Sequence, residues 1–99
     1  MPVYLVAAAQ VADRVEYEEY VRKAAPTFAG VDVKVLALSD EPVLLEGSTS
    51  PNRVAVMEFP DMAKVEAWYN NEAYQSEAVP LRHAASTTNF IVLIQGNET

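Results

Sequence analysis

The chain has 99 residues, of which 51% are hydrophobic and 21% charged, and its 14 acidic and 7 basic side chains give a net charge of −7. This length suits one domain with a packed core and excludes two, so we expect residues 1–99 to form a single domain. The negative charge argues against binding to nucleic acid or to an anionic membrane surface. The absence of cysteine excludes disulfides and thiolate metal sites, and permits a reducing compartment.

The amino-terminal segment, residues 1–14, is apolar but carries no basic residue ahead of its short hydrophobic run. No stretch of the sequence approaches the roughly 18 consecutive apolar residues that a membrane-spanning helix requires. We therefore expect a cytoplasmic protein with neither a secretory leader nor a membrane anchor.

The first part of the chain predicts a strand, a helix and a second strand. Residues 3–9 form an apolar run with the length and Val and Tyr content of a buried strand. Asp13 and Glu16 have the spacing of a capping box, so a helix should begin there and end at Pro26 and Gly30. Residues 31–38 then alternate as a strand does. The predicted faces of that strand are Val31, Val33, Val35 and Ala37 on one side, and Asp32, Lys34, Leu36 and Leu38 on the other.

A long polar loop is predicted after the second strand. Residues 39–52 contain a short apolar piece at 43–45, but Gly, Ser, Thr, Pro and Asn dominate the remainder, which is typical of an exposed loop. The apolar run at 53–59, closed by a proline, predicts a third strand.

The last part of the chain predicts helical segments and a final strand. Asp61 lies where a second helix needs its cap, and that helix should break at Asn70 and Asn71 before a further segment that Pro80 kinks or restarts. Residues 88–95 predict the last strand, and residues 96–99 a tail. The resulting order, β-α-β-β-α-β, predicts an α+β, ferredoxin-like subunit with a four-stranded antiparallel sheet and helices on one face.

Helices on one side leave the other side of this sheet uncovered, and that side should be polar if it meets water. Both alternating sets of side chains are apolar in the first strand, and in the last strand Phe90, Val92 and Ile94 alternate with Ile91 and Leu93. Several hundred Å² of exposed apolar sheet would favour association by on the order of 10 kcal/mol. We therefore expect a homodimer joined sheet to sheet. The alternative is that the loop at 39–52 folds over the open face.

Short motifs spread over nearly the whole chain resemble a known family. They are Tyr17-Glu18-Glu19-Tyr20, Glu46-Gly47, Pro51-Asn52-Arg53-Val54, Glu58-Phe59-Pro60-Asp61, Ala67-Trp68-Tyr69-Asn70, Glu72-Ala73-Tyr74-Gln75 and Leu81-Arg82. With them the sequence resembles the domain of unknown function 1330 family, in the dimeric α/β-barrel superfamily. The resemblance implies a ferredoxin-like subunit and a homodimer whose two sheets form a barrel, but it implies no activity. The sequence departs from the family pattern near Gly30, where a second glycine is common.

Two arginines are candidates for binding a ligand between helix and sheet. A guanidinium can hold a carboxylate through two parallel hydrogen bonds, and the resemblance supports a role for Arg53, at the start of the third strand. Arg82 is a similar candidate. The alternative for Arg53 is an ion pair that organises the loop, with Glu58, Glu46 or Asp61 as its partner.

Three aromatic residues, Trp68, Tyr69 and Tyr74, lie within seven positions of one another and complete the set of pocket candidates. A helix that bends at the two asparagines could present them to a cleft between helix and sheet. Aromatic residues at helical spacing equally suit a packed core.

No catalytic residue is identified with certainty by the sequence. His83 is the candidate base, because imidazole ordinarily titrates near neutrality; the alternative is a surface histidine. Without the initiator methionine, Pro2 would present a secondary amine at the start of a strand, as in tautomerases that use a terminal proline as base. No metal site, phosphate-binding loop or nucleophile triad is visible, and no cofactor is expected.

Three functions stay open at this point. The first is a homodimer, catalytic weakly or not at all, that binds a small organic molecule, anionic if Arg53 clamps it, between helix and sheet. The second is a cofactor-free enzyme of the monooxygenase or isomerase kind found among dimeric α/β barrels, an analogy of fold in which His83 is the base, Arg53 the anion clamp, and Trp68 and Tyr74 the pocket walls. The third is a structural interaction module. A cavity would keep the first two open, whereas a filled core would favour the third.

Overall fold

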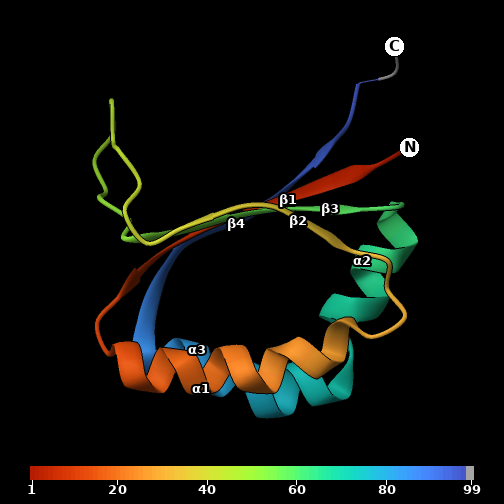
Figure 1. Ribbon diagram of the computed structural model, residues 1–99, viewed down its shortest axis with the longest axis horizontal. Coiled ribbons are helices and arrows are strands. Elements are labelled where there is room, and N and C mark those ends of the chain that lie inside the picture. Colours follow the sequence, from red (N-terminus) through yellow and green to blue (C-terminus); the bar gives the residue numbers. More distant parts are fainter. Residues whose placement is uncertain (98–99) are drawn as a thin grey trace.

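The computed structural model describes residues 1–97, which form a four-stranded antiparallel sheet with helices on one face (Figure 1). The strands are β1 (Val3–Val11), β2 (Lys34–Ser39), β3 (Arg53–Phe59) and β4 (Ser86–Gln95). Their spatial order is β2-β3-β1-β4, with every neighbouring pair antiparallel. This is the predicted ferredoxin-like α+β fold. Part of the predicted tail, residues 98–99, lies outside the described residues.

The helices begin where their capping residues lie. These helical segments are α1 (Arg14–Ala24), the 3-10 turn η1 (Ala25–Phe28), α2 (Met62–Tyr69), the π turn η2 (Tyr74–Ala78) and α3 (Val79–Ala85). Asp13 accepts a hydrogen bond from the Glu16 amide at 3.0 Å, and Asp61 caps α2 through the Lys64 amide at 2.9 Å.

Two local details of the helices refine the sequence interpretation. The Asp13 amide donates to the Ala85 carbonyl at 3.1 Å, so only one half of the predicted capping box forms. Helix α2 ends at Tyr69 with Asn70 as its cap, which confirms the predicted interruption. Pro80 lies in the first turn of α3, but helical residues run without a break from 72 to 85, so the proline follows the π turn η2 within one helical stretch and does not begin a separate helix.

Strand β2 differs from the sequence prediction in its start and in its faces. Gly30 and Asp32 have φ angles of 76° and 64°, so the backbone turns through left-handed conformations and the strand begins only at Lys34. A bulge between Val35 and Ala37 then shifts the register. As a result Leu38 lies on the helix-covered side with Val35, and the predicted strict alternation is wrong beyond Val35.

The core lies between the sheet and the helices. Val3, Leu5 and Phe59 from the sheet are buried against Val65, Trp68 and Tyr74 from the helical side. The Trp68 ring centroid is 5.7 Å from that of Phe59 and 4.4 Å from that of Tyr74. Within residues 1–97, no helix has the length and apolar character needed to cross a membrane.

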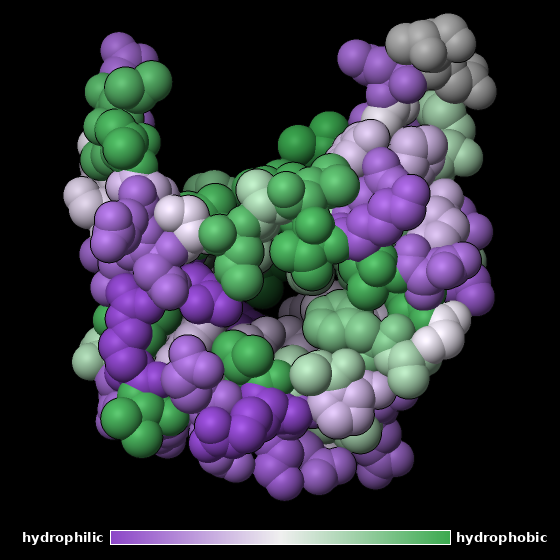
Figure 2. Space-filling model, viewed as in Figure 1, coloured by the Kyte–Doolittle hydropathy of each residue, from purple (hydrophilic) through white to green (hydrophobic). Residues whose placement is uncertain are grey.

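The sheet face opposite the helices is apolar and uncovered. Cross-strand partners share a face, which places these side chains together on it: Tyr4, Val6, Val54, Val56, Phe90, Val92 and Ile94. Phe90, Val92 and Ile94 are 45%, 42% and 53% exposed. We call these seven residues the open face; Figure 2 shows apolar surface at the floor of a notch above the sheet.

The predicted loop does not cover this face. Residues 40–52, called the arm below, contain no helix or strand and project away from the sheet on its open side (Figure 1). Val43 and Leu45 in the arm are 83% and 90% exposed. The alternative in which this segment folds over the open face is therefore wrong.

Candidate functional site

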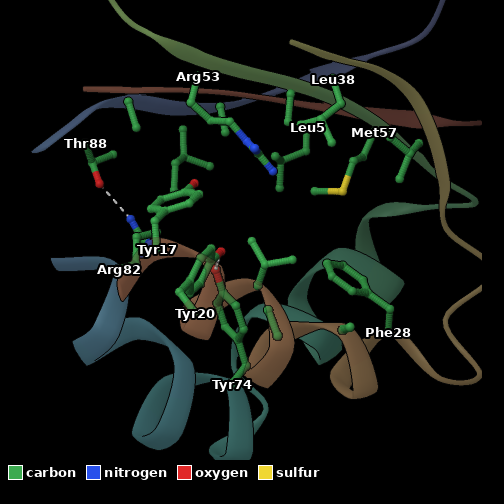
Figure 3. A pocket seen from close by; sticks show the side chains of 18 of the residues that line it. Leu5, Tyr17, Tyr20, Phe28, Leu38, Arg53, Met57, Tyr74, Arg82 and Thr88 are labelled. Carbon is green, nitrogen blue, oxygen red and sulfur yellow. Dashed lines mark hydrogen bonds between the residues drawn. The ribbon is translucent and has the colours of Figure 1, made fainter. Parts of the chain in front are cut away.

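A cavity of about 350 Å³ lies between the sheet and helix α1, within the range of roughly 300–1,000 Å³ typical of small-molecule sites. Figure 2 shows the surface hollowed at this level, and Figure 3 shows the side chains around the hollow. Most of the lining is apolar, and its polar groups come from five side chains in particular: Tyr17, Tyr20, Arg53, Tyr74 and Arg82. The core is therefore not completely filled, whereas a filled core would have favoured a purely structural role.

Arg82 is buried at one end of the cavity. Its side chain is on α3, the residue is 5% exposed, and its Nη1 donates to the Thr88 hydroxyl at 2.7 Å (Figure 3). Its Nε has no hydrogen-bond partner among residues 1–97. The described residues that line the cavity include no Asp, Glu or His. The guanidinium is therefore buried without a carboxylate to compensate its charge, which is costly in a protein interior.

Arg53 projects from β3 into the same cavity, but its charge is paired. Its Nη1 lies 2.8 Å from Asp40 Oδ1, which also accepts from Arg14 at 2.9 Å. The hydrogen bond from Arg53 is the main cause that lowers the pKa of Asp40 below its ordinary value, with Arg14 assisting. The Arg53 guanidinium also lies over the Tyr17 ring, 5.4 Å from its centroid.

The partner of Arg53 corrects the sequence interpretation, which offered Glu58, Glu46 or Asp61. Glu58 is an odd number of positions from Arg53 along β3, so the two side chains point to opposite faces of the sheet. Glu58 instead lies 3.7 Å from Lys34. Asp40 reaches Arg53 because β2 and β3 pair at that end, where the arm begins.

Two tyrosine hydroxyls meet in the wall of the cavity. Tyr20 from α1 and Tyr74 from η2 lie 3.0 Å apart, oxygen to oxygen, and either can donate to the other (Figure 3). Burial, and then the neighbouring Tyr74, raise the pKa of Tyr20 above its ordinary value. Burial likewise raises the pKa of Tyr17, against the opposing effect of Arg53 and Arg82. The Tyr17 and Tyr20 hydroxyls therefore keep their protons at neutral pH and can act as hydrogen-bond donors.

The end of the cavity away from Arg82 is apolar. Figure 3 shows Phe28 and Met57 on that side, opposite Arg82 and Thr88. Trp68 forms part of the wall and stacks on Phe28 at 4.8 Å between ring centroids. The indole nitrogen of Trp68 donates to the Thr27 hydroxyl at 3.0 Å, so its polar atom is already engaged. The cavity thus has a charged end near Arg82 and an apolar end near Phe28 and Met57.

Three residues singled out from the sequence lie outside the cavity. Tyr69 is 40% exposed and His83 is exposed, and neither lines the hollow. Pro2 lies at the start of β1, where its carbonyl accepts from the Gly96 amide at 2.9 Å. The candidate base of the enzyme interpretation therefore faces solvent instead of a ligand.

Sequence reasoning missed the contribution of helix α1. Tyr17 and Tyr20 were named only as part of a family motif, yet both line the cavity. The available signal was the spacing of these two tyrosines. Residues three positions apart lie on the same face of a helix, so both hydroxyl-bearing rings should face the sheet together. Thr88, the partner of Arg82, carried no signal in the sequence.

The lining can bind an oxyanion better than it can move a proton. Its guanidiniums only donate hydrogen bonds, and burial keeps the hydroxyls of Tyr17 and Tyr20 protonated. No carboxylate or imidazole among the described lining residues could accept a proton from a bound molecule. Within residues 1–97, no three His, Cys, Asp or Glu side chains gather as metal ligands would.

Solved structures share this fold. A protein of unknown function from Rhodopseudomonas palustris, RPA0582, superposes with a TM-score of 0.79 at 19% identity, over 99% of this chain and 84% of that one. SnoaB, a cofactor-independent oxygenase from Streptomyces nogalater, gives a TM-score of 0.64 at 19% identity, over 99% and 95%. At these identities the likeness concerns the fold alone.

Sequence comparison identifies the family. No protein of curated function matches the chain. A family model described as "Domain of unknown function (DUF1330)" matches residues 2–96, nearly the whole sequence. The motifs, the fold and this match agree, and the chain belongs to the DUF1330 family.

Proposed function

We propose that this protein is a homodimer that binds a small organic anion in the cavity between helix α1 and the sheet. The observation that supports this most directly is Arg82, a guanidinium 5% exposed that lines the cavity without a carboxylate beside it. An anionic ligand would supply the missing charge, and charge-assisted hydrogen bonds to a buried arginine are among the stronger ones in proteins.

The two ends of the cavity indicate what kind of anion would suit it. The ligand's acidic group would lie near Arg82, and its apolar body would extend toward Phe28 and Met57 (Figure 3). Arg53 is less suited to be the primary clamp, because Asp40 already neutralises it. This reverses the relative weight that the sequence put on the two arginines.

Thermal unfolding with matched ligands tests the proposal. The ligands are 1-naphthoate and its neutral counterpart 1-naphthamide, which have nearly the same shape and differ in charge. A ligand at ten times its dissociation constant stabilises the folded state by about 1.4 kcal/mol, which raises the Tm of a chain this size by roughly 5–10 °C. We expect such a shift with naphthoate and a much smaller one with naphthamide.

The variant that decides the role of Arg82 is Arg82→Met, compared with Arg22→Met. Arg22 is exposed and forms an ion pair with Glu19 on its own helix, so its replacement controls for the loss of a positive charge. The naphthoate shift should disappear in Arg82→Met and persist in Arg22→Met. Equal shifts with acid and amide, or an undiminished shift in Arg82→Met, would contradict an anion site.

A second candidate is a cofactor-free oxygenase, favoured by the likeness to SnoaB, which is described as a cofactor-independent oxygenase. The buried Arg82 guanidinium could stabilise an enolate or phenolate oxygen. The cavity offers no base, so a substrate would need to ionise near neutral pH by itself. Oxygen consumption in step with loss of an added hydroquinone, abolished in Arg82→Met, would favour this function over simple binding.

The homodimer rests on the open face. Its seven side chains are apolar, and exposed apolar patches of several hundred Å² mark association surfaces in folded proteins. Lys34 and Glu58 lie on the same side of the sheet as these seven residues, and they pair with each other. Among residues 1–97, the strand register places no other charge on that side, so a copy of an acidic chain can approach without repulsion at the contact. The cytoplasmic location expected from the sequence stays a prediction.

A further inference from the structure

The arm, residues 40–52, is held firmly at both of its ends. At the first end, Asp40 joins Arg14 and Arg53. At the second end, the Asn52 amide donates to the Ala9 carbonyl at 3.0 Å, and the Asn52 side chain exchanges two hydrogen bonds with the Val11 backbone, at 2.7 and 3.0 Å. The structure therefore sets the direction in which the arm leaves the sheet.

The middle of the arm has no such support. Among residues 1–97, no hydrogen bond or ion pair ties positions 42–51 to the remainder of the chain. Val43, Leu44 and Leu45, called the arm tip, are nevertheless apolar and 83%, 46% and 90% exposed. Figure 2 shows apolar surface on the projection at the left of the notch, on the same side of the molecule as the open face. Three adjacent apolar side chains thus stand in solvent on a rigidly rooted segment.

The size of the open face suggests why the arm would matter. Four strands of about eight residues, spaced about 4.8 Å apart, present a face of roughly 500 Å², whereas a standard interface buries about 800 Å² per partner. Burial of the arm tip would add about 200–300 Å² of apolar area to the interface of each subunit. This area follows from the transfer free energies of Val and Leu side chains, divided by the usual free energy per Å². The open face alone is small for a stable dimer, and the face with the arm reaches the ordinary size.

We propose that the arm tip of each subunit packs against a second copy of this chain and completes the homodimer interface. The inference rests on the homodimer proposed above and specifies it. A twofold axis through the open face would bring each arm beside the other subunit, since arm and face lie on one side of the molecule. The tip itself carries no charge, which suits contact with an acidic copy.

Thiol protection tests the position of the arm tip, and the cysteine-free sequence makes single labels unambiguous. Leu45→Cys is compared with Val15→Cys, because Val15 is also apolar and 81% exposed but lies on helix α1, on the far side of the sheet. Labelling rates are measured above and below the concentration at which the protein dissociates. We expect at least roughly tenfold slower labelling of Leu45→Cys in the dimer and no change for Val15→Cys.

The energetic test replaces the tip by V43S, L44S and L45S together, with Val15→Ser as the control. Sedimentation should show a dimer dissociation constant increased by at least roughly a hundredfold for the triple variant and unchanged for the control. Circular dichroism and the naphthoate shift should stay as in the wild type, because no tip residue touches the cavity.

The outcomes separate the two proposals. A wild-type protein that stays monomeric at every concentration would overturn both the homodimer and the role of the arm. A dimer whose affinity is unaffected by the triple variant would overturn the arm alone. Protection of Leu45→Cys that does not depend on concentration would show the tip packing within its own subunit, and would likewise overturn the arm's role between subunits.

Discussion

The two faces of the sheet are both apolar, but they differ in what the chain itself places against them. The helix-covered face packs Trp68 and Tyr74 over Leu5 and still leaves a cavity with a buried arginine. The open face has no covering element among residues 1–97. Apolar sheet surface therefore has two surroundings here: one side forms a core around a cavity, and the other is exposed, as surfaces that associate often are. The predictions below test whether the roles proposed for the two sides are separable.

The largest effect is expected on the open face. Val92→Glu, or Val6→Glu on the neighbouring strand, places a carboxylate in the centre of the apolar surface that two copies would share. Burying an unpaired charge costs several kcal/mol, so we expect a monomer or an unfolded chain. Sedimentation and circular dichroism measure the two outcomes. Val15→Glu is the matched control on the outer surface of α1, and normal dimers of both Val92→Glu and Val6→Glu would contradict the sheet-to-sheet arrangement.

The next effect concerns the core of the covered face. Trp68→Ala removes a ring that is 4% exposed and stacks on Phe28, so we expect a loss of about 3–5 kcal/mol in the free energy of unfolding. Tyr69→Ala, one residue along and 40% exposed, should cost about 1 kcal/mol or less. Urea unfolding of both variants gives the comparison. Similar losses of unfolding free energy in the two variants would contradict the assignment of Trp68 to the core and Tyr69 to the surface.

A smaller effect, of opposite sign, is expected at the buried arginine. Arg82→Met removes a charge without a counter-ion and one hydrogen bond to Thr88, and the relief from burying the charge should exceed the lost bond. We expect the ligand-free protein to become about 1 kcal/mol more stable, while it loses naphthoate binding. Arg22→Met should stay within about 0.5 kcal/mol of the wild type. A strongly destabilised Arg82→Met would mean that the arginine serves the fold.

The smallest expected effect is that of pH between 6 and 9. The pKa of Tyr17 and that of Tyr20 are raised by burial, so any stability that depends on their protons is present below about pH 10 and is lost only above it. The pKa of Asp40 is lowered, chiefly by Arg53, so its contribution is lost only as the pH falls below about 4. Naphthoate affinity, measured by calorimetry, should therefore be flat across this range. A midpoint near neutrality, removed by His83→Gln, would bring His83 back as a functional group.

Sequence reasoning succeeded where the signal was local. Both aspartate caps lie at the residues named for them, and α2 ends where Asn70 and Asn71 follow it. It was less accurate at β2, because Val31, Val33 and Val35 alternate in the sequence while Gly30 and Asp32 turn the backbone and a bulge shifts the register. The bulge depends on how β2 pairs with β3, a contact between distant segments that no single-strand pattern records.

Of the five pocket candidates, four line one cavity and Tyr69 does not. Residue type indicated that arginines and aromatic residues would line a pocket. It could not indicate which of the two guanidinium groups has a carboxylate partner. The sequence interpretation favoured Arg53 as the clamp, although both residues carry the same guanidinium group. Only the approach of Asp40, thirteen positions before Arg53, distinguishes them.

The sequence by itself determined the fold class, the positions of most elements and the excess of apolar strand surface, because strand alternation, helix caps and hydrophobic content act over a few neighbouring residues. The tertiary structure decided which arginine lacks a partner, where the cavity opens, and that the arm projects from the sheet without covering it. These depend on side chains that meet from distant parts of the chain, and on the charges that remain unpaired after they have met.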